Sequence, residues 1–200
     1  MADFNIKTYD NRLHNIYITG EVDETMWQTL VDKINEIKAA DREIDETNVG
    51  TLSLFGIEAQ AIHPPINIYL NTYGGCIHDM LAIYDEIRVL TTLYEVNIIC
   101  TGKVMSAGTI IMLAVPLEHR FSYSNTTFMY HSLSAFAFGK IKEMEENVEE
   151  SKRLHKIMWN IYKDNTAIPK EKLDEIYKSK IDWFITADQA KKYKIISKIL

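Results

Sequence analysis

Ser106 and His131 are the two side chains of this sequence whose types and surroundings could support nucleophilic catalysis. Ser106 stands in the run Gly102-Lys-Val-Met-Ser-Ala-Gly108, between an apolar β-branched stretch and an apolar stretch typical of a buried helix. His131 ends the next stretch that is predicted to be a strand. A serine hydroxyl becomes a nucleophile when a histidine takes its proton, so the pair indicates hydrolase chemistry. The alternatives are a serine that only caps a helix and a histidine that only fills the core.

The glycine pair Gly74-Gly75 could complete such a site. Residues without a side chain allow backbone N–H groups to approach a ligand closely. An oxyanion hole needs two such donors, and the N–H groups of Gly75 and Ala107 are the candidates. A simple tight turn after a strand is the alternative explanation of the two glycines.

The segments that must position these residues alternate between strands and helices. The pattern predicts strands at 14–19, 66–70, 96–101, 128–131 and 195–200, and helices at 23–40, 77–90, 107–115, 141–164, 169–178 and from 186 onward. Gly102 is expected to end the third of these strands. Such alternation favours parallel strands joined by crossover helices, whose ligands gather at the carboxyl ends of the strands. Both glycine-containing turns lie at that edge.

The chain of 200 residues fits a single domain. Residues 1–12 form a short N-terminal segment, and the stretch 41–65 is acidic at its start and ends in two prolines, which predicts an irregular insertion. A handle region is expected at about 134–164. Its helix is longer than a small core needs, so we expect part of it to project and pack against another subunit, or to lie at the domain edge.

The composition excludes several classes of function. A hydrophobic content of 46% is ordinary for a globular protein, and a net charge of −6 provides no basic field for nucleic acid or an anionic membrane. Cys76 and Cys100 do not suggest a disulfide framework, and Cys76 with His78 is too sparse a set for a metal site. The sequence has neither a secretory signal pattern nor an apolar run of membrane-spanning length, so we expect a cytoplasmic protein.

Four runs together resemble the proteolytic subunit of the ATP-dependent Clp protease. They are Asn71-Thr-Tyr-Gly-Gly75, Ala82-Ile-Tyr-Asp85, Gly102-Lys-Val-Met-Ser-Ala-Gly108 and Tyr130-His131. Their order and spacing agree with that family throughout. The resemblance implies that Ser106 is the nucleophile, that His131 is the base, and that Asp182 is the acid that orients the histidine. Asp182 precedes the run Trp-Phe-Ile-Thr-Ala, where the family has its third catalytic residue, although an aspartate there could instead cap a turn.

The resemblance also implies a fold and an activity. The fold would be the ClpP/crotonase-like α/β fold of repeated ββα-type units with a projecting helical handle. The activity would be that of a serine endopeptidase, which hydrolyses unfolded proteins to short peptides inside two stacked seven-membered rings. A hexameric AAA+ unfoldase would feed this tetradecamer and use the ATP, so the subunit itself would need no metal or cofactor. Tyr73, Ala107 and Leu133 depart from the family pattern, which implies a reshaped substrate pocket.

Two other functions are compatible with parts of this pattern. A crotonase-type hydratase or isomerase acting on acyl-CoA also uses backbone N–H groups as an oxyanion hole, but it does not need Ser106, His131 and Asp182 together. A non-catalytic ring subunit is the second possibility. Loss of activity on Ser106→Ala would separate the protease from both.

Overall fold

A parallel β-sheet forms the centre of the structure, a computed structural model that describes residues 7–56, 62–133, 140–179 and 181–200. The main strand order is β1-β2-β3-β4-β7, and all of these pairs are parallel. β5 pairs in parallel with the distal part of β3, and β6 runs antiparallel to β5. The strands are β1 (Asn15–Val22), β2 (Ile66–Gly75), β3 (Val96–Met105), β4 (Arg120–Ser122), β5 (Thr127–Tyr130), β6 (Trp183–Thr186) and β7 (Lys198–Ile199). The α/β class with parallel strands is therefore confirmed, and the antiparallel β5–β6 pair is an addition to it.

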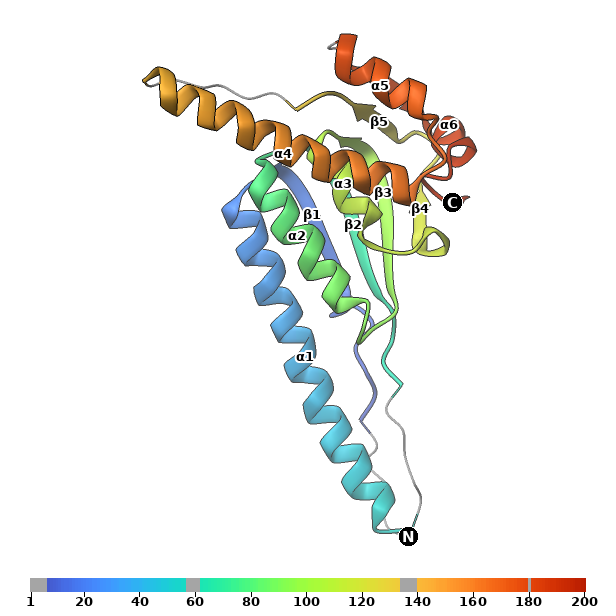
Figure 1. The fold of residues 1–200 in the computed structure, drawn as a ribbon. Coiled ribbons are helices and arrows are strands. Elements are labelled where there is room, and N and C mark those ends of the chain that lie inside the picture. Colours follow the sequence, from blue (N-terminus) through green and yellow to red (C-terminus); the bar gives the residue numbers. More distant parts are fainter. Residues whose placement is uncertain (1–6, 57–61, 134–139, 180) are drawn as a thin grey trace.

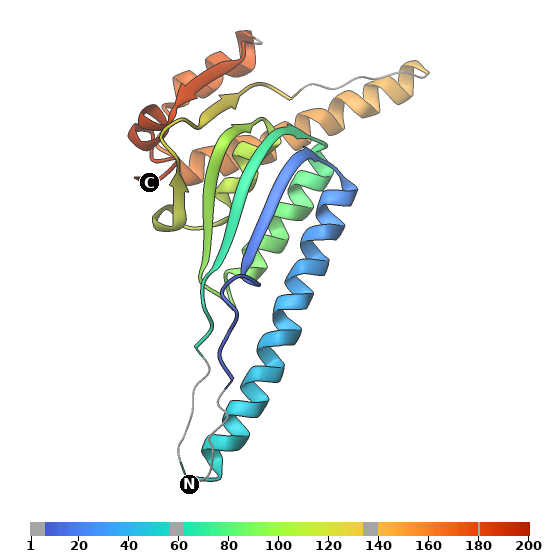
Figure 2. The same ribbon diagram turned by 180° about the vertical axis from the view of Figure 1, so that it is seen from behind.

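The helices are α1 (Glu24–Ser53), α2 (Ile77–Leu90), α3 (Ala107–Ile111), α4 (Ile141–Asn165), α5 (Lys170–Ser179) and α6 (Ala187–Lys192). Two of them, α1 and α2, lie along the first three strands, whereas α6 contacts β5, β6 and β7. Figure 1 shows α1 and α2 in front of β1, β2 and β3, and Figure 2 shows the opposite face of these strands. Side chains alternate accordingly: Ile66, Ile68 and Leu70 of β2 are buried, whereas Tyr17 of β1 is exposed.

Helix α1 is longer than expected. We predicted a helix to about residue 40 and an irregular insertion over 41–65, but α1 continues to Ser53, so the prediction was wrong for residues 41–53. The buried positions Ile34 and Ile37 are followed on the same face by Asp41, which is also buried. The inward face changes from aliphatic to polar side chains while the helix continues, and apolar periodicity cannot detect such a continuation.

Strand β3 does not end at Gly102. Leu70 pairs with Cys100, but Thr72 pairs with Val104, so β3 contains extra residues between the two pairs. Gly102 has φ of +58°, a conformation that L side chains rarely adopt. It therefore marks a β-bulge inside the strand rather than its end, and β3 carries the chain on to Met105.

The segments after β3 largely follow the prediction. The buried helix expected at 107–115 is α3, continued by a 3₁₀ turn at Met112–Ala114. α5 begins one residue after Pro169, and the Thr186 side chain accepts a hydrogen bond from the N–H of Gln189 in a capping box. The terminal strand is shorter than expected, because β7 contains only two residues.

The handle helix α4 projects beyond the sheet at its N-terminal end (Figure 1). Its buried residues, Leu154, Met158 and Tyr162, all lie in its C-terminal half. Packing of the projecting half against another subunit remains a prediction. Residues 134–139 of the expected handle region and residues 1–6 of the N-terminal segment lie outside the described residues. Within the described ranges, no helix combines the length and apolar character needed to cross a bilayer.

Candidate active site

Ser106 lies at the sharp turn between β3 and α3, with φ of 52° and ψ of −120°. A positive φ is uncommon for a residue other than glycine and costs about 1–3 kcal/mol. The Ser106 N–H donates a hydrogen bond to the Met129 carbonyl of β5 at 2.9 Å, which ties the turn to the neighbouring strand. A strained strand-to-helix turn of this kind presents a serine hydroxyl at the edge of a sheet, as a nucleophile elbow does.

His131 lies within hydrogen-bond distance of that hydroxyl. The separation between His131 Nε2 and Ser106 Oγ is 2.6 Å. The strand register causes this proximity, because Met105 pairs with Met129 in the parallel β3–β5 ladder and both side chains follow shortly afterwards. A neutral imidazole that accepts the serine proton at Nε2 carries its own proton on Nδ1. The arrangement can therefore transfer a proton from the serine to the histidine.

The glycine pair lies directly against the serine turn. A Cβ added to Gly74 would stand 2.6 Å from Ser106 Cβ and 3.0 Å from Ala107 N. Gly75 borders the same cleft as Ser106 and Ala107. Ala107 is the first residue of α3, so its N–H has no partner within the helix. Gly75 and Ala107, whose N–H groups are the predicted oxyanion donors, therefore border one cleft together with Ser106.

The cleft beside Ser106 is small and mostly apolar, with a volume of about 120 Å³. It is lined by Gly75, Ile77, Met80, Ser106, Ala107, His131, Ser132, Leu133 and Met158. Of the three departures from the family pattern, Ala107 and Leu133 line this cleft. Tyr73 is instead exposed, with Lys103 Nζ 4.0 Å from the centre of its ring.

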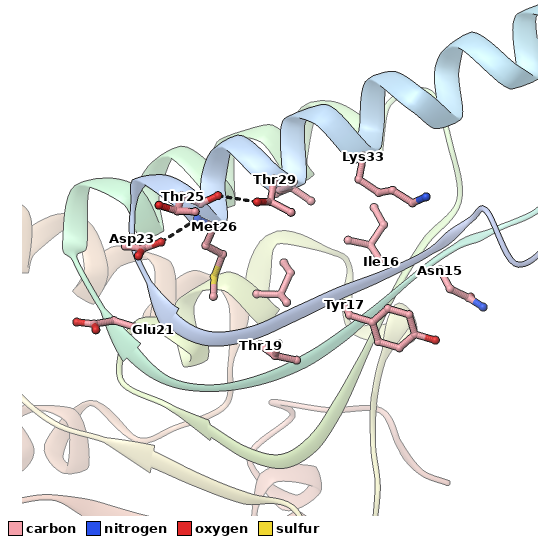
Figure 3. A pocket seen from close by; sticks show the side chains of 12 residues that line it. Asn15, Ile16, Tyr17, Thr19, Glu21, Asp23, Thr25, Met26, Thr29 and Lys33 are labelled. Carbon is pink, nitrogen blue, oxygen red and sulfur yellow. Dashed lines mark hydrogen bonds between the residues drawn. The ribbon is translucent and has the colours of Figure 1, made fainter.

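A larger hollow lies elsewhere, between β1 and the start of α1. This groove has a volume of about 530 Å³. Figure 3 shows the side chain of Met26 directed from α1 toward β1. The lining of the groove includes Tyr17, Asp23 and Lys33 but neither histidine, serine nor cysteine. Because it offers no nucleophile with a base, cavity volume alone would not have identified the Ser106 cleft.

Asp182 is not joined to His131. The antiparallel register of β5 and β6 ends at the pair Tyr130 and Trp183, so its next step would set His131 opposite Asp182. Asp182 is exposed, and no hydrogen bond or ion pair connects these two described side chains. The structure thus brings together Ser106, His131 and the two predicted amides, and places Asp182 nearby without a contact.

Two further side chains, which the sequence analysis did not identify, form hydrogen bonds at the serine turn. The Thr109 hydroxyl donates a hydrogen bond to the Ser106 carbonyl at 2.6 Å, and it lies 2.7 Å from the Tyr162 hydroxyl of α4. Burial raises the pKa of Tyr162 well above its usual value. Each residue occupies a buried position where an apolar side chain would also fit, so the local sequence gives no sign of this contact.

A second cluster of polar side chains contacts the C-terminal half of α1. The sequence analysis assigned no role to its histidines. His14 Nε2 lies 3.0 Å from Asp41 Oδ2, and both side chains are almost completely buried. His63 Nδ1 lies 3.5 Å from the same oxygen, and its Nε2 lies 3.6 Å from Asp45 Oδ2. The Tyr9 hydroxyl is hydrogen-bonded to Asp45, and burial with the neighbouring Asp45 raises the pKa of Tyr9 to about 12. Among the residues that the structure describes, no group of His, Cys, Asp or Glu side chains is arranged to hold a metal ion.

Comparison with known proteins identifies the family of this chain. The family model described as Clp protease matches residues 20–200. The ATP-dependent Clp protease proteolytic subunit of Deinococcus radiodurans is 30% identical over 144 residues, which cover 72% of this chain and 69% of that protein. The ATP-dependent Clp protease proteolytic subunit 2 of Pseudomonas aeruginosa is 27% identical over 192 residues, or 96% of this chain and 83% of that protein.

The fold is also that of a solved relative. The structure of a ClpP1 mutant from Listeria monocytogenes superimposes with a TM-score of 0.72 and 22% sequence identity, over 94% of this chain and 92% of that one. This likeness confirms the ClpP-like fold expected from the sequence. The family model covers almost the whole chain, including the serine turn, β5 and β6. The chain belongs to the Clp protease family.

Proposed function

We propose that this chain is a serine endopeptidase of the Clp type, with Ser106 as nucleophile, His131 as general base and acid, and Asp182 as the residue that orients the histidine. The distance of 2.6 Å between His131 Nε2 and Ser106 Oγ is the observation that carries the proposal. Family membership implies peptidase activity, and this contact supplies the chemistry. A Clp-type peptidase also accounts for the strained serine turn and the adjacent glycines.

The reaction proceeds in two steps. Ser106 Oγ attacks the scissile carbonyl carbon while His131 Nε2 takes its proton, and the oxyanion that forms accepts hydrogen bonds from the N–H groups of Gly75 and Ala107. His131 returns the proton to the leaving amine as the C–N bond breaks. Water then attacks the acyl carbon while His131 takes its proton, and His131 returns that proton to Ser106 Oγ as the ester C–O bond breaks and the peptide acid leaves. These steps use only protein groups and water.

Asp182 completes the site through a small shift at the ends of β5 and β6. The register of these strands would set Asp182 opposite His131, but their pairing ends one residue earlier, at Tyr130 and Trp183. A carboxylate that accepts the Nδ1 proton would hold the reactive tautomer and stabilise the imidazolium. We infer that assembly of subunits supplies this shift, because Asp182 is exposed in the single chain.

Assembly and partners follow from the same family. We place the chain in seven-membered rings stacked as a tetradecamer, with a Clp-type AAA+ ATPase delivering unfolded protein substrates. The projecting half of α4 supports assembly, since most of its apolar stripe has no partner within the described chain. The relatives from Deinococcus radiodurans and Pseudomonas aeruginosa are described as ATP-dependent, which supports an ATPase partner. The cytoplasmic location expected from the sequence also stays a prediction.

A fluorophosphonate carrying a fluorophore tests the proposal directly. Ser106 Oγ displaces fluoride from phosphorus, and the serine proton passes to His131, so labelling reports both groups. We expect labelling of the wild type, none of Ser106→Ala, and strongly slowed labelling of His131→Ala. Native mass spectrometry of the same samples gives the oligomeric state, for which Ser106→Ala is the matched control. Ser106-independent labelling, or none in an assembled oligomer, would contradict the catalytic assignment, and binding of an acyl-CoA thioester would then favour a hydratase.

A further inference from the structure

We propose that Thr109 and Tyr162 are positioning residues that aim the N–H group of Ala107 into the Ser106 cleft. This inference rests on the proposed function, because it concerns the oxyanion hole of that site. The link runs from α4 through Thr109 to the carbonyl group of Ser106. Neither side chain lines the Ser106 cleft, so both act through the backbone.

The direction of each hydrogen bond in this link is fixed by chemistry. The Ser106 carbonyl can only accept, and it receives the Thr109 N–H at 2.9 Å and the Thr109 hydroxyl at 2.6 Å. Since the Thr109 hydroxyl donates its only proton to that carbonyl, it must accept the proton of the Tyr162 hydroxyl, 2.7 Å away. The chain of donors therefore runs from Tyr162 to Thr109 to Ser106.

The link is buried, which makes it hard to replace by water. Thr109 is fully buried and Tyr162 is 7% exposed. The Tyr162 ring packs on Tyr130, with 5.3 Å between ring centres. Burial raises the pKa of the Tyr162 hydroxyl, so it keeps the donated proton at neutral pH. A buried hydroxyl that loses its partner is left unsatisfied, and the remaining partner cannot turn to solvent.

The carbonyl of Ser106 matters because it shares a peptide plane with the N–H of Ala107. In a planar trans peptide the C=O and N–H bonds point in opposite directions. Holding the Ser106 carbonyl toward Thr109 therefore directs the Ala107 N–H the other way, toward the cleft that Ala107 lines.

The peptide plane before the serine is held independently of this link. The Ser106 N–H donates to the Met129 carbonyl of β5. The strained φ of Ser106 is thus maintained from both sides, by β5 before the residue and by Thr109 with Tyr162 after it. Loosening only the second side should weaken oxyanion stabilisation without displacing the serine hydroxyl from His131.

The test measures fluorophosphonate labelling kinetics on the full-length assembled protein. Tyr162→Phe removes one hydroxyl, Thr109→Val removes the other, and Thr109→Ser keeps it. Tyr130→Phe is the matched control, because the buried Tyr130 hydroxyl has no hydrogen-bond partner among the described residues and its ring contacts Tyr162. For each variant, the maximal rate constant kinact and the probe's inhibition constant KI are determined separately, together with the native mass.

We expect Tyr162→Phe to lower kinact about three- to tenfold with KI unchanged, the range that one buried hydrogen bond supports. Thr109→Val should lower kinact at least as much, and the double variant should be no worse than Thr109→Val, because the two hydroxyls act as one unit. Thr109→Ser should restore the wild-type kinact. Tyr130→Phe should label like the wild type.

Other outcomes overturn the inference and leave the proposed function in place. These are wild-type kinact in both Tyr162→Phe and Thr109→Val, additive losses in the double variant, or a loss that lies in KI. If Tyr162→Phe does not assemble, the comparison of Thr109→Val with Thr109→Ser decides the point. A wild type that shows no Ser106-dependent labelling would instead overturn the proposed function, and the inference with it.

Discussion

His131 and Asp182 would form the next pair of the β5–β6 ladder, but the ladder stops one pair before them. The last paired residues of the antiparallel ladder are Tyr130 and Trp183, and the next residues along the two strands are the histidine and the aspartate. The histidine already contacts Ser106, whereas the aspartate is exposed. In this single chain the proposed nucleophile and base are in contact while the proposed orienting acid is not, which makes Asp182 the most informative residue to change.

Replacement of Asp182 by asparagine should lower kinact for the fluorophosphonate by about 10²–10⁴, the usual contribution of positioned proton transfer. Asparagine keeps the size of the side chain, but it does not stabilise the imidazolium of His131. Asp188→Asn is the matched control, because this exposed aspartate lies in α6. Wild-type labelling by Asp182→Asn would mean that His131 relies on another orienting group.

Gly74→Ala should abolish labelling of Ser106. The added Cβ would stand 2.6 Å from Ser106 Cβ, so the serine turn has to move. Gly20→Ala controls for the backbone conformation, because Gly20 also has a positive φ but has no atom within 4 Å of an added Cβ. Gly20→Ala should cost only about 1–2 kcal/mol of stability and should keep its labelling. Equal labelling of the two variants would contradict the close approach of Gly74 to Ser106.

His155 should make the protein less stable in mild acid. Burial lowers the pKa of this histidine below its usual 6.5, and its ring stacks on Tyr177 with 4.0 Å between centres. Below pH 6.5 the unfolded chain takes up a proton that the folded chain does not, so the free energy of unfolding falls as the pH drops through the folded pKa. His155→Phe keeps an aromatic ring and removes the titration. Denaturant unfolding at pH 7 and pH 5 should show a smaller loss for His155→Phe than for wild type, and an equal loss would contradict it.

The pair of His14 and Asp41 should contribute strongly to the stability of α1. Their side chains are only 1% and 2% exposed, and removal of one partner leaves a buried polar group without compensation. Asp41→Ala should therefore cost about 3–5 kcal/mol in the free energy of unfolding, measured by denaturant titration. The double variant His14→Phe with Asp41→Leu should recover only the part of this loss that comes from the unpaired His14, because His63, whose Nδ1 lies 3.5 Å from Asp41 Oδ2, still loses its partner. A double variant that is as unstable as Asp41→Ala would contradict the contribution of the contact between His14 and Asp41.

The local sequence was sufficient to find Ser106 and His131. Each follows a strand that contains β-branched or aromatic residues, and strand order in an α/β sheet brings such ends to one edge. Gly75 was predicted for the same reason, because a glycine pair at the end of a strand allows a close approach of the backbone. Each of these residues stands at the strand end that positions it or next to that end in sequence, so a local pattern is enough to predict it.

Other parts of the site and the fold depend on contacts between distant segments. Thr109 meets Tyr162 because α4 crosses α3, and neither residue carries a local signal of that meeting. The continuation of α1 involves the contact between Asp41 and His14, and the whole of β1 separates His14 from the helix in the sequence. The periodicity of apolar residues reveals a helix face that packs against other apolar side chains. It does not reveal a face whose polar side chains are buried against polar partners.

The bulge at Gly102 also makes the active site sensitive to chain length. Before it, Ile98 to Cys100 pair with β4, and after it, Lys103 to Met105 pair with β5, so β3 changes neighbours at this point. Side chains alternate between the two faces of a strand, and insertion or deletion of one residue between Gly102 and Ser106 would turn the serine away from His131. The number of residues in this short stretch is therefore constrained as tightly as their identity, and variation among related chains should be confined to substitutions there.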